Sequence, residues 1–170
     1  MKLLVLSDTH HRLDNAREVL RRIGGSMDMV VHLGDHDTDA DVLQQEFPTL
    51  PFHAVSGNND SAMDTPGEKM LFVAGKRILL THGHKQRVSW GYDTISYWAE
   101  EQGADAVLFG HTHRPVYEAG RVLLLNPGSI SLPRGGTPPS FAVLTITENG
   151  RMEGAVMAFH PKETFARIRI

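Results

Sequence analysis

Five short apolar segments of this sequence each end in a cluster of Asp, Asn, His and Gly residues. In chain order the clusters are Ser7–His10, Gly34–Asp37, Ser56–Asp60, Thr81–His84 and Gly110–His113. Carboxylate, imidazole and amide oxygen, in a chain without any cysteine, are donors that suit borderline or hard divalent metals. The clusters therefore predict a metal site assembled from several separate segments.

These clusters hold more donors than one tetrahedral ion can use. The candidate ligands are Asp8, His10, Asp35, Asn58, His82, His111 and His113. They suffice for two ions if one carboxylate bridges, and two ions about 3.5–4 Å apart clamp an in-line displacement at phosphorus. Hydrolysis of a phosphoester is therefore the predicted chemistry. The neighbouring glycines are expected to allow sharp turns and to leave room for the phosphate.

Each candidate ligand also has a structural interpretation. Asp8 and Asp35 would serve equally well as caps of the helices that follow them. Asn58 would suit a turn, and a lone histidine such as His10 is commonly a solvated loop residue. The metal interpretation explains all of these residues at once, whereas the structural interpretations must all hold together.

Strand-like and helical patterns alternate through the first two thirds of the chain and give way to hairpins. Strands are predicted at 2–6, 29–33, 52–55, 69–73, 76–80, 106–109, 122–125, 141–147 and 152–159, and helices at 13–23, 39–47 and 93–102. This order is typical of a mixed α/β domain in which more than one sheet shares a core. Ligands of open α/β sheets bind at the carboxyl ends of strands, so the five clusters are expected to meet.

The composition is that of an ordinary globular protein. The chain has 170 residues, 41% of them hydrophobic, and is expected to form one domain over residues 1–170. Its 17 basic and 20 acidic residues give a net charge of −3, which carries no strong nucleic-acid signature. The first apolar run, 2–6, is too short for a membrane span or a signal-peptide core, so we expect a cytoplasmic protein.

The clusters, in this order, resemble the calcineurin-like metallophosphoesterase superfamily. Its pattern D-x-H, GD, GN, H and GHxH corresponds here to Asp8-x-His10, Gly34-Asp35, Gly57-Asn58, His82 and Gly110-His111-x-His113. The segment 126–129 is similar to the small bacterial and archaeal phosphodiesterase branch, which is related to the small subunit of the retromer coat. The resemblance extends from the first strand to about Arg134.

This resemblance implies a four-layer α-β-β-α sandwich of two mixed β-sheets holding a dinuclear site. One ion would take Asp8, His10, Asp35 and His113. The second would take Asp35, Asn58, His82 and His111, so that Asp35 bridges the two and a metal-bridging hydroxide attacks phosphorus. The implied activity is metal-dependent hydrolysis of a small phosphoester, a diester rather than a monoester. Mn²⁺ is the favoured metal, with Ni²⁺, Fe²⁺, Co²⁺ or Zn²⁺ as alternatives.

One departure from the superfamily pattern bears on catalysis. Larger members carry a histidine directly after the GN asparagine, and this chain has Asn59 there. Asparagine can donate a hydrogen bond to a phosphoryl oxygen but cannot act as a general acid near pH 7. Asp60, which would orient that histidine, is expected to lose its role. Asn59 and His84 are the candidate catalytic residues, with His36 as a second substitute for the acid.

Further contacts and partners are also expected. His11 and Arg134 are candidates for contacting the substrate phosphate, since guanidinium matches phosphate geometry. Four aromatic residues, Trp90, Tyr92, Tyr97 and Trp98, are expected to pack the 93–102 helix on the core or to form a homo-oligomer interface. The alternative function is a non-catalytic interaction scaffold or a metal sensor on the same fold.

Overall fold

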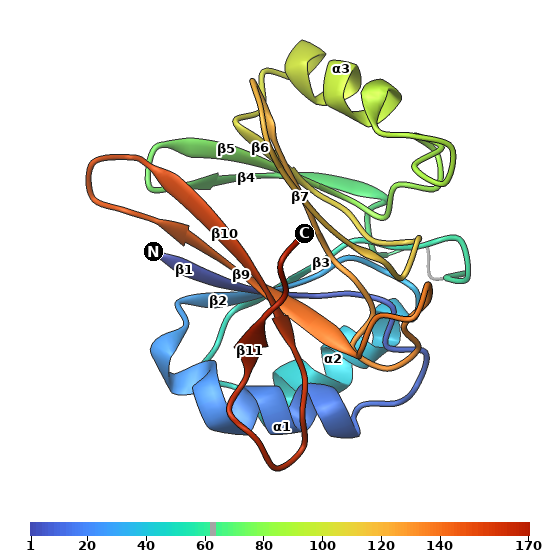
Figure 1. Ribbon diagram of the computed structural model, residues 1–170, viewed down its shortest axis with the longest axis vertical. Coiled ribbons are helices and arrows are strands. Elements are labelled where there is room, and N and C mark those ends of the chain that lie inside the picture. Colours follow the sequence, from blue (N-terminus) through green and yellow to red (C-terminus); the bar gives the residue numbers. More distant parts are fainter. Residues whose placement is uncertain (62–63) are drawn as a thin grey trace.

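The computed structural model describes residues 1–61 and 64–170, which form four layers (Figure 1). Two β-sheets pack face to face in the middle of the molecule. Helices α1 and α2 cover the outer face of one sheet and α3 covers the outer face of the other. The predicted α-β-β-α sandwich of two mixed sheets is confirmed.

The first sheet has the strand order β11-β10-β9-β1-β2-β3. Its strands are β1 (Lys2–Leu6), β2 (Met29–His32), β3 (Phe52–Ala54), β9 (Ser140–Ile146), β10 (Met152–Ala158) and β11 (Ala166–Arg167). The pairs β1–β2 and β2–β3 are parallel, and β1–β9, β9–β10 and β10–β11 are antiparallel. The carboxyl ends of β1, β2 and β3 therefore lie at one edge of this sheet.

The second sheet has the strand order β4-β5-β6-β8-β7. Its strands are β4 (Glu68–Val73), β5 (Lys76–Thr81), β6 (Ala106–Leu108), β7 (Pro115–Ala119) and β8 (Leu123–Pro127). The central strands β5, β6 and β8 are parallel, while β4 and β7 pair antiparallel at the two edges. Pro115, which has no N–H to donate, is compatible with the edge position of β7.

In the described part of the chain, three α-helices flank the sheets: α1 (Asp14–Ile23), α2 (Asp37–Glu46) and α3 (Asp93–Glu101). The residues at the N-caps of α1 and α2 are Leu13 and His36, and neither makes a side-chain capping bond. Asp8 and Asp35 are therefore not the caps of these helices. Among the described residues, no helix is long and apolar enough to cross a membrane.

The core is divided by the two sheets into three apolar clusters. Strand β1 shows the reason for its uninterrupted apolar sequence. Leu3 and Val5 pack between the sheets, whereas Leu4 and Leu6 pack with the residues under α1 and α2. A strand buried on both faces reads as a continuous apolar run. The third cluster joins the second sheet to α3.

The predicted elements differ from the structure in a few places. Helix α2 begins at residue 37, two residues before the predicted start, and neither β7 nor β11 was among the predicted strands. Strand β11 has only two residues and owes its pairing to β10. Tyr92 and Trp98 pack on the core, as the first alternative predicted. Trp90 and Tyr97 are 92% and 67% exposed and do not pack on it, so a homo-oligomer interface stays a prediction for these two.

Candidate metal centre

All five polar clusters lie at the carboxyl ends of parallel strands, where the two sheets meet. Within the first sheet, the Asp8 N–H donates to the Gly34 carbonyl over 3.1 Å. Within the second sheet, the Gly110 N–H donates to the His82 carbonyl over 3.1 Å. A 2.7 Å hydrogen bond from His82 Nδ1 to the Leu33 carbonyl joins the two sheets. The packing of the sheets therefore forms one site from five segments.

The first set of candidate ligands is compact. One ligand atom from each of Asp8, His10, Asp35 and His113 lies within 4.8 Å of every other. His113 Nε2 is 3.2 Å from Asp8 Oδ1 and 3.3 Å from His10 Nε2. Ligands about 2.1 Å from one ion lie about 3.0–3.4 Å apart, so these separations fit a shared cation.

The second set of candidate ligands lies on the other side of the Asp35 carboxylate from the first. It consists of Asp35, Asn58, His82 and His111. His82 Nε2 is 3.2 Å from Asn58 Oδ1 and 3.4 Å from Asp35 Oδ1. The His111 ring centroid is 5.1 Å from that of His82. The other Asp35 oxygen, Oδ2, is 3.8 Å from His10 Nε2 in the first set. Asp35 thus presents one oxygen to each set.

Hydrogen bonds on the far side of two imidazoles decide which nitrogen faces the site. His113 Nδ1 lies 2.6 Å from the Leu132 carbonyl, and His82 Nδ1 is bound to the Leu33 carbonyl. Carbonyls accept only, so in the neutral form each Nε2 is an unprotonated acceptor. While His113 is neutral, Asp8 Oδ1 is a buried oxygen without a hydrogen-bond donor among the described residues. Unprotonated imidazole nitrogens and a carboxylate oxygen thus face one another in a buried site. A cation bound between them would satisfy these acceptor atoms.

The backbone at the site is strained. Five of the candidate ligands have positive φ: Asp8 at 55°, His10 at 47°, Asp35 at 53°, His111 at 70° and His113 at 56°. Positive φ in a residue other than glycine costs about 1–2 kcal/mol. The accumulation of this strain at the ligands indicates a functional site, where the surrounding structure tolerates it.

Glycines beside the ligands allow the loops to approach each other. A Cβ on Gly57 would lie 2.2 Å from Asp35 Oδ1, and one on Gly110 would lie 2.0 Å from Ser7 Oγ. Side chains of adjacent loops thus fill the space at these two glycines. The expectation that glycines leave room for phosphate is wrong at these positions, because inter-loop packing requires them.

Asp8 and His113 favour opposite charges in the metal-free protein. Burial acts to raise the pKa of Asp8, but His113, His82 and Ser7 outweigh it and the pKa is lowered. Burial acts to lower the pKa of His113, but Asp8 and the Leu132 carbonyl outweigh it and the pKa is raised. A cation that binds beside Asp8 would displace the proton of His113.

Burial controls the other imidazoles whose pKa is shifted at the site. It is the largest cause of the lowered pKa of His10, of His84 and of His111. The carboxylates of Asp8 and Asp35 partly oppose it at His10 and His111, and that of Asp35 alone does so at His84. These three imidazoles are therefore neutral near pH 7, the form in which imidazole binds metal.

The structure corrects the expectation for Asp60. Its carboxylate accepts four backbone N–H groups, from Gly57 at 2.6 Å, Asp35 at 3.1 Å, His36 at 2.9 Å and Asp37 at 3.0 Å. These bonds tie the loop after β3 to the loop after β2 and satisfy the first N–H of α2. Asp60 therefore has a structural role, which also explains why α2 begins early.

Asn59 contacts the central carboxylate. Its side-chain Nδ2 donates to Asp35 Oδ2 over 2.7 Å, and its backbone N–H donates to Asp35 Oδ1 over 3.1 Å. His84 lies near the second set, with its ring centroid 5.5 Å from His82 and 6.2 Å from His111. Its Nδ1 is buried without a hydrogen-bond partner in the described part of the chain.

The candidate substrate contacts lie around the first set of ligands. The side chain of His11 is 67% exposed, and its Nδ1 is 3.2 Å from Asp39 Oδ1. The His36 ring packs on that of His11 at a centroid distance of 3.8 Å. Arg134 is exposed, and its backbone N–H donates to the His113 carbonyl over 3.1 Å.

The comparison with known families agrees with this geometry. The sequence profile described as a calcineurin-like phosphoesterase superfamily domain matches residues 1–149. The chain belongs to this superfamily. The resemblance of the sequence motifs is thereby confirmed.

Two curated relatives carry names that state an activity. The "Probable metallophosphoesterase YsnB" of Bacillus subtilis is 36% identical over 148 residues, 86% of this chain and 85% of that protein. The "Phosphodiesterase YfcE" of Escherichia coli K12 is 30% identical over 167 residues, 85% of this chain and 87% of that protein. A solved structure of YfcE has a TM-score of 0.69 at 28% identity and covers 99% of this chain and 98% of its own.

Vps29 from Entamoeba histolytica, solved in complex with Zn²⁺, shares the fold. Its TM-score is 0.79, and the match covers 99% of this chain and 98% of that chain at 23% identity. An identity this low indicates common architecture only.

The calcineurin-like fold is supported here by residues that the sequence motifs did not identify. Buried Asp39 accepts hydrogen bonds from the Thr9 hydroxyl at 2.6 Å and from the His11 N–H at 2.9 Å. The Ser129 hydroxyl donates to the Asp8 carbonyl over 2.8 Å. An acidic residue in the first turn of a helix is ordinary, so only the contact across elements distinguishes Asp39.

His32, at the end of β2, is hydrogen-bonded to the loop that follows β1. The Gly34 N–H donates to His32 Nδ1 over 3.3 Å, so Nε2 carries the proton and donates to Thr9 Oγ1 at 3.0 Å. Complete burial lowers the pKa of His32 and outweighs the opposing effects of Asp39 and Asp8. His32 is therefore held neutral in the folded protein.

This burial predicts a loss of stability in mild acid. The folded pKa of His32 lies below its unfolded value of 6.5, so the unfolded state binds more protons as the pH falls below 6.5. For His32→Gln, we expect the slope of unfolding free energy against pH between 7 and 5 to decrease by up to about 1.4 kcal/mol per pH unit. Urea unfolding of metal-free protein measures the slope. His160→Gln, a half-exposed position, is the control, and an equal slope in both variants would contradict the prediction.

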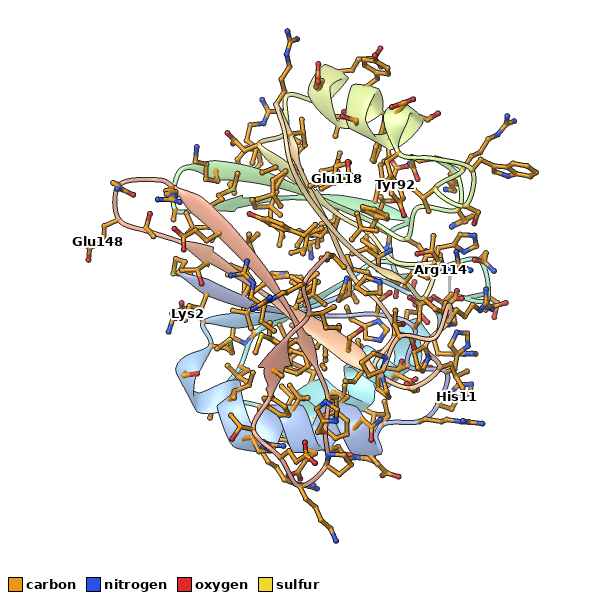
Figure 2. All side chains as sticks on the ribbon, viewed as in Figure 1. Lys2, His11, Tyr92, Arg114, Glu118 and Glu148 are labelled. Atoms are coloured by element: carbon orange, nitrogen blue, oxygen red, sulfur yellow. The ribbon has the colours of Figure 1, made fainter. Side chains whose placement is uncertain are left out.

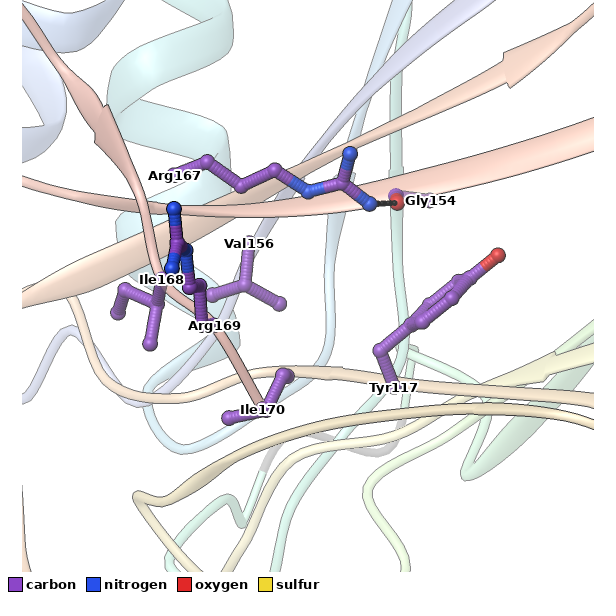
Figure 3. A pocket seen from close by; sticks show the side chains of 7 residues that line it. All are labelled: Tyr117, Gly154, Val156, Arg167, Ile168, Arg169 and Ile170. Carbon is purple, nitrogen blue, oxygen red and sulfur yellow. Dashed lines mark hydrogen bonds between the residues drawn. The ribbon is translucent and has the colours of Figure 1, made fainter.

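A cavity elsewhere in the molecule is not a candidate metal site. It has a volume of about 320 Å³ and lies under the C-terminal segment (Figure 3). Its lining residues are Tyr117, Gly154, Val156, Arg167, Ile168, Arg169 and Ile170. This lining contains neither carboxylate nor imidazole side chains, so it lacks the donors that a divalent ion requires.

Proposed function

We propose that this protein is a metal-dependent phosphodiesterase with a site for two divalent ions, of which Mn²⁺ is preferred. The observation that carries the proposal is the convergence of acceptor atoms from Asp8, His10, Asp35 and His113 at the edge where the sheets meet. Membership of the calcineurin-like superfamily and the name of the relative YfcE support phosphodiester chemistry.

We assign one ion to Asp8, His10, Asp35 and His113, and the second to Asp35, Asn58, His82 and His111. When bound, such ions would activate the attacking water and neutralise the phosphoryl oxygens. The chain itself holds the ligands in place. The Leu132 and Leu33 carbonyls orient His113 and His82, and Asn59 orients Asp35 through two hydrogen bonds.

The substrate phosphate would enter from the exposed side of this site. Figure 2 shows His11 at this edge of the molecule, with its exposed side chain. Asp39 holds the His11 imidazole through Nδ1, so Nε2 would donate to a phosphoryl oxygen only in the doubly protonated imidazolium. Arg134 is held next to His113 by its backbone and is the second proposed phosphate contact.

The decisive experiment measures hydrolysis by chelator-stripped protein. The substrates are bis-p-nitrophenyl phosphate and p-nitrophenyl phosphate, each with and without added Mn²⁺, Ni²⁺, Fe²⁺, Co²⁺ or Zn²⁺. We expect metal to restore cleavage, Mn²⁺ most effectively, and the diester to be cleaved faster than the monoester. Folded protein that cleaves neither substrate with any metal would refute the proposal and favour the scaffold or sensor function.

His84 is the proposed proton donor to the leaving group, because Asn59 cannot act as a general acid. Since burial lowers the pKa of His84, the acid is the minor, protonated form of this imidazole near pH 7. Its ring lies beside the second ligand set. We expect His84→Ala to lower turnover of an alkyl ester about 10²-fold, the lower end of general-acid contributions. Turnover of nitrophenyl esters should fall much less, because nitrophenolate needs no protonation.

The measurement compares kcat on methyl p-nitrophenyl phosphate with kcat on a dialkyl phosphate for both proteins. Lys85→Ala, an exposed neighbour, is the control. An equal loss on both substrates would show that His84 does not donate the proton.

A further inference from the structure

A second polar pocket shares a wall with the candidate metal centre. Its volume is about 240 Å³, and its lining residues are Val88, Ser89, Tyr92, Thr112, Arg114 and Arg134. Thr112 lies between His111 and His113 in the sequence, and the Arg134 N–H is bound to the His113 carbonyl. The pocket therefore adjoins the ligands of both proposed ions.

Two guanidinium groups line this small pocket. Within residues 1–61 and 64–170, neither Arg114 nor Arg134 forms an ion pair within 4.0 Å, whereas Arg17 and Arg121 do. Two cations that share a pocket without an acidic partner repel each other and leave their donors to solvent. An anion bound in the pocket would offset the repulsion between the two guanidinium groups and would accept hydrogen bonds from their N–H donors.

The position of Arg114 is built into the loops. Thr112 Oγ1 bonds to both the N–H and the carbonyl of Arg114, each over 3.3 Å. A Cβ on Gly135 would lie 2.9 Å from Arg114 Nε, so the guanidinium arm passes close to that loop. Figure 2 shows Arg114 at the same edge of the molecule as His11. The backbone of Arg114 is thus held beside the site, and its exposed guanidinium arm lines the pocket.

The other lining groups suit a phosphate. Burial and Glu118 raise the pKa of Tyr92, with Arg114 only partly opposing, so the phenol keeps its proton and can donate it in a hydrogen bond. The Ser89 side chain is exposed and adds a hydroxyl donor. Guanidinium groups bind phosphate oxygens in pairs with matched geometry.

We propose that this pocket binds a second phosphate group of the substrate while the scissile phosphate occupies the metal centre. The substrate class is then a phosphoester that carries at least one further phosphate a short distance away. This inference rests on the proposed function, because the first phosphate is placed at the metal site. Arg134 lies between the two positions, and Arg114 belongs to the second alone.

The test measures inhibition of bis-p-nitrophenyl phosphate hydrolysis at saturating metal. The inhibitors are linear alkanediol bisphosphates with chains of two to six carbons and the corresponding alkyl monophosphates. We expect at least one bisphosphate to bind about tenfold or more tightly than its matched monophosphate. We expect Arg114→Ala to reduce that preference to about twofold or less. Arg121→Ala, an exposed arginine in the β7–β8 turn, should retain the full preference.

Two results would overturn the inference. One is the absence of any bisphosphate preference at every chain length, and the other is an undiminished preference in Arg114→Ala. Failure of the proposed function gives a different result, namely no hydrolysis with any metal. In that case calorimetric titration of the same pairs of ligands into metal-loaded protein measures the preference without turnover.

Discussion

Asp35→Ala is expected to abolish binding of both metal ions and to lower kcat/KM on bis-p-nitrophenyl phosphate by about 10³-fold or more. The physical reason is the position of the carboxylate between the two ligand sets. Its Oδ1 faces His82 at 3.4 Å and its Oδ2 faces His10 at 3.8 Å. Removing it takes away a shared anionic ligand and leaves the Asn59 donors without their acceptor.

Metal content of purified protein, measured by mass spectrometry, distinguishes this expectation from a general loss of structure. Wild-type protein should retain two ions, Asp8→Ala about one, and Asp35→Ala none. Asp35→Asn keeps the side-chain volume and should also lose both ions. Asp41→Ala, an exposed position on α2, is the matched control. One ion retained by Asp35→Ala would contradict a bridging role.

Asp60→Asn is expected to destabilise the protein by about 2–4 kcal/mol and to weaken metal binding at the same time. The carboxylate accepts four backbone N–H groups, whereas the amide has a single acceptor oxygen and turns an NH₂ toward two of the donors. In a domain of this size the change corresponds to a melting temperature lower by roughly 5–15 °C.

The pH dependence of this effect has a definite sign. Burial acts to raise the pKa of Asp60, but the N–H groups of Gly57, Asp37 and His36 outweigh it and the pKa is lowered. The stabilisation is therefore fully present above the unfolded value of 3.8 and is lost as the pH falls through the lower folded value. The difference between wild-type protein and Asp60→Asn should shrink in strong acid.

Thermal unfolding of metal-free and metal-loaded protein measures both parts of the prediction. Asp64→Asn makes the same change of charge at an exposed position four residues away, and it should have little effect. A metal-free melting temperature unchanged in Asp60→Asn would mean that the four hydrogen bonds do not hold the two loops together.

Much of the architecture could be predicted from the sequence because its signals are local. The apolar runs of β1 and β2 and the hairpin between β4 and β5 follow from periodicity and turn residues. Each cluster of candidate ligands directly follows a strand, and parallel strands bring their carboxyl ends to one edge. The types of the candidate ligands, their order along the chain and the superfamily could therefore be predicted from the sequence.

What the sequence by itself determined is most of the strands, the candidate ligands that follow them and the chemistry those donors suit. Only the tertiary structure decided how the loops hold one another. Asp60 has a structural role because its carboxylate reaches N–H groups more than twenty residues away in the sequence. Gly57 and Gly110 serve contact between loops, and Arg114 shares a pocket with Arg134 because the loop after β8 is bonded to the loop after β6. Contacts of this kind depend on how the two sheets are stacked, and a local pattern of residue types does not encode that geometry.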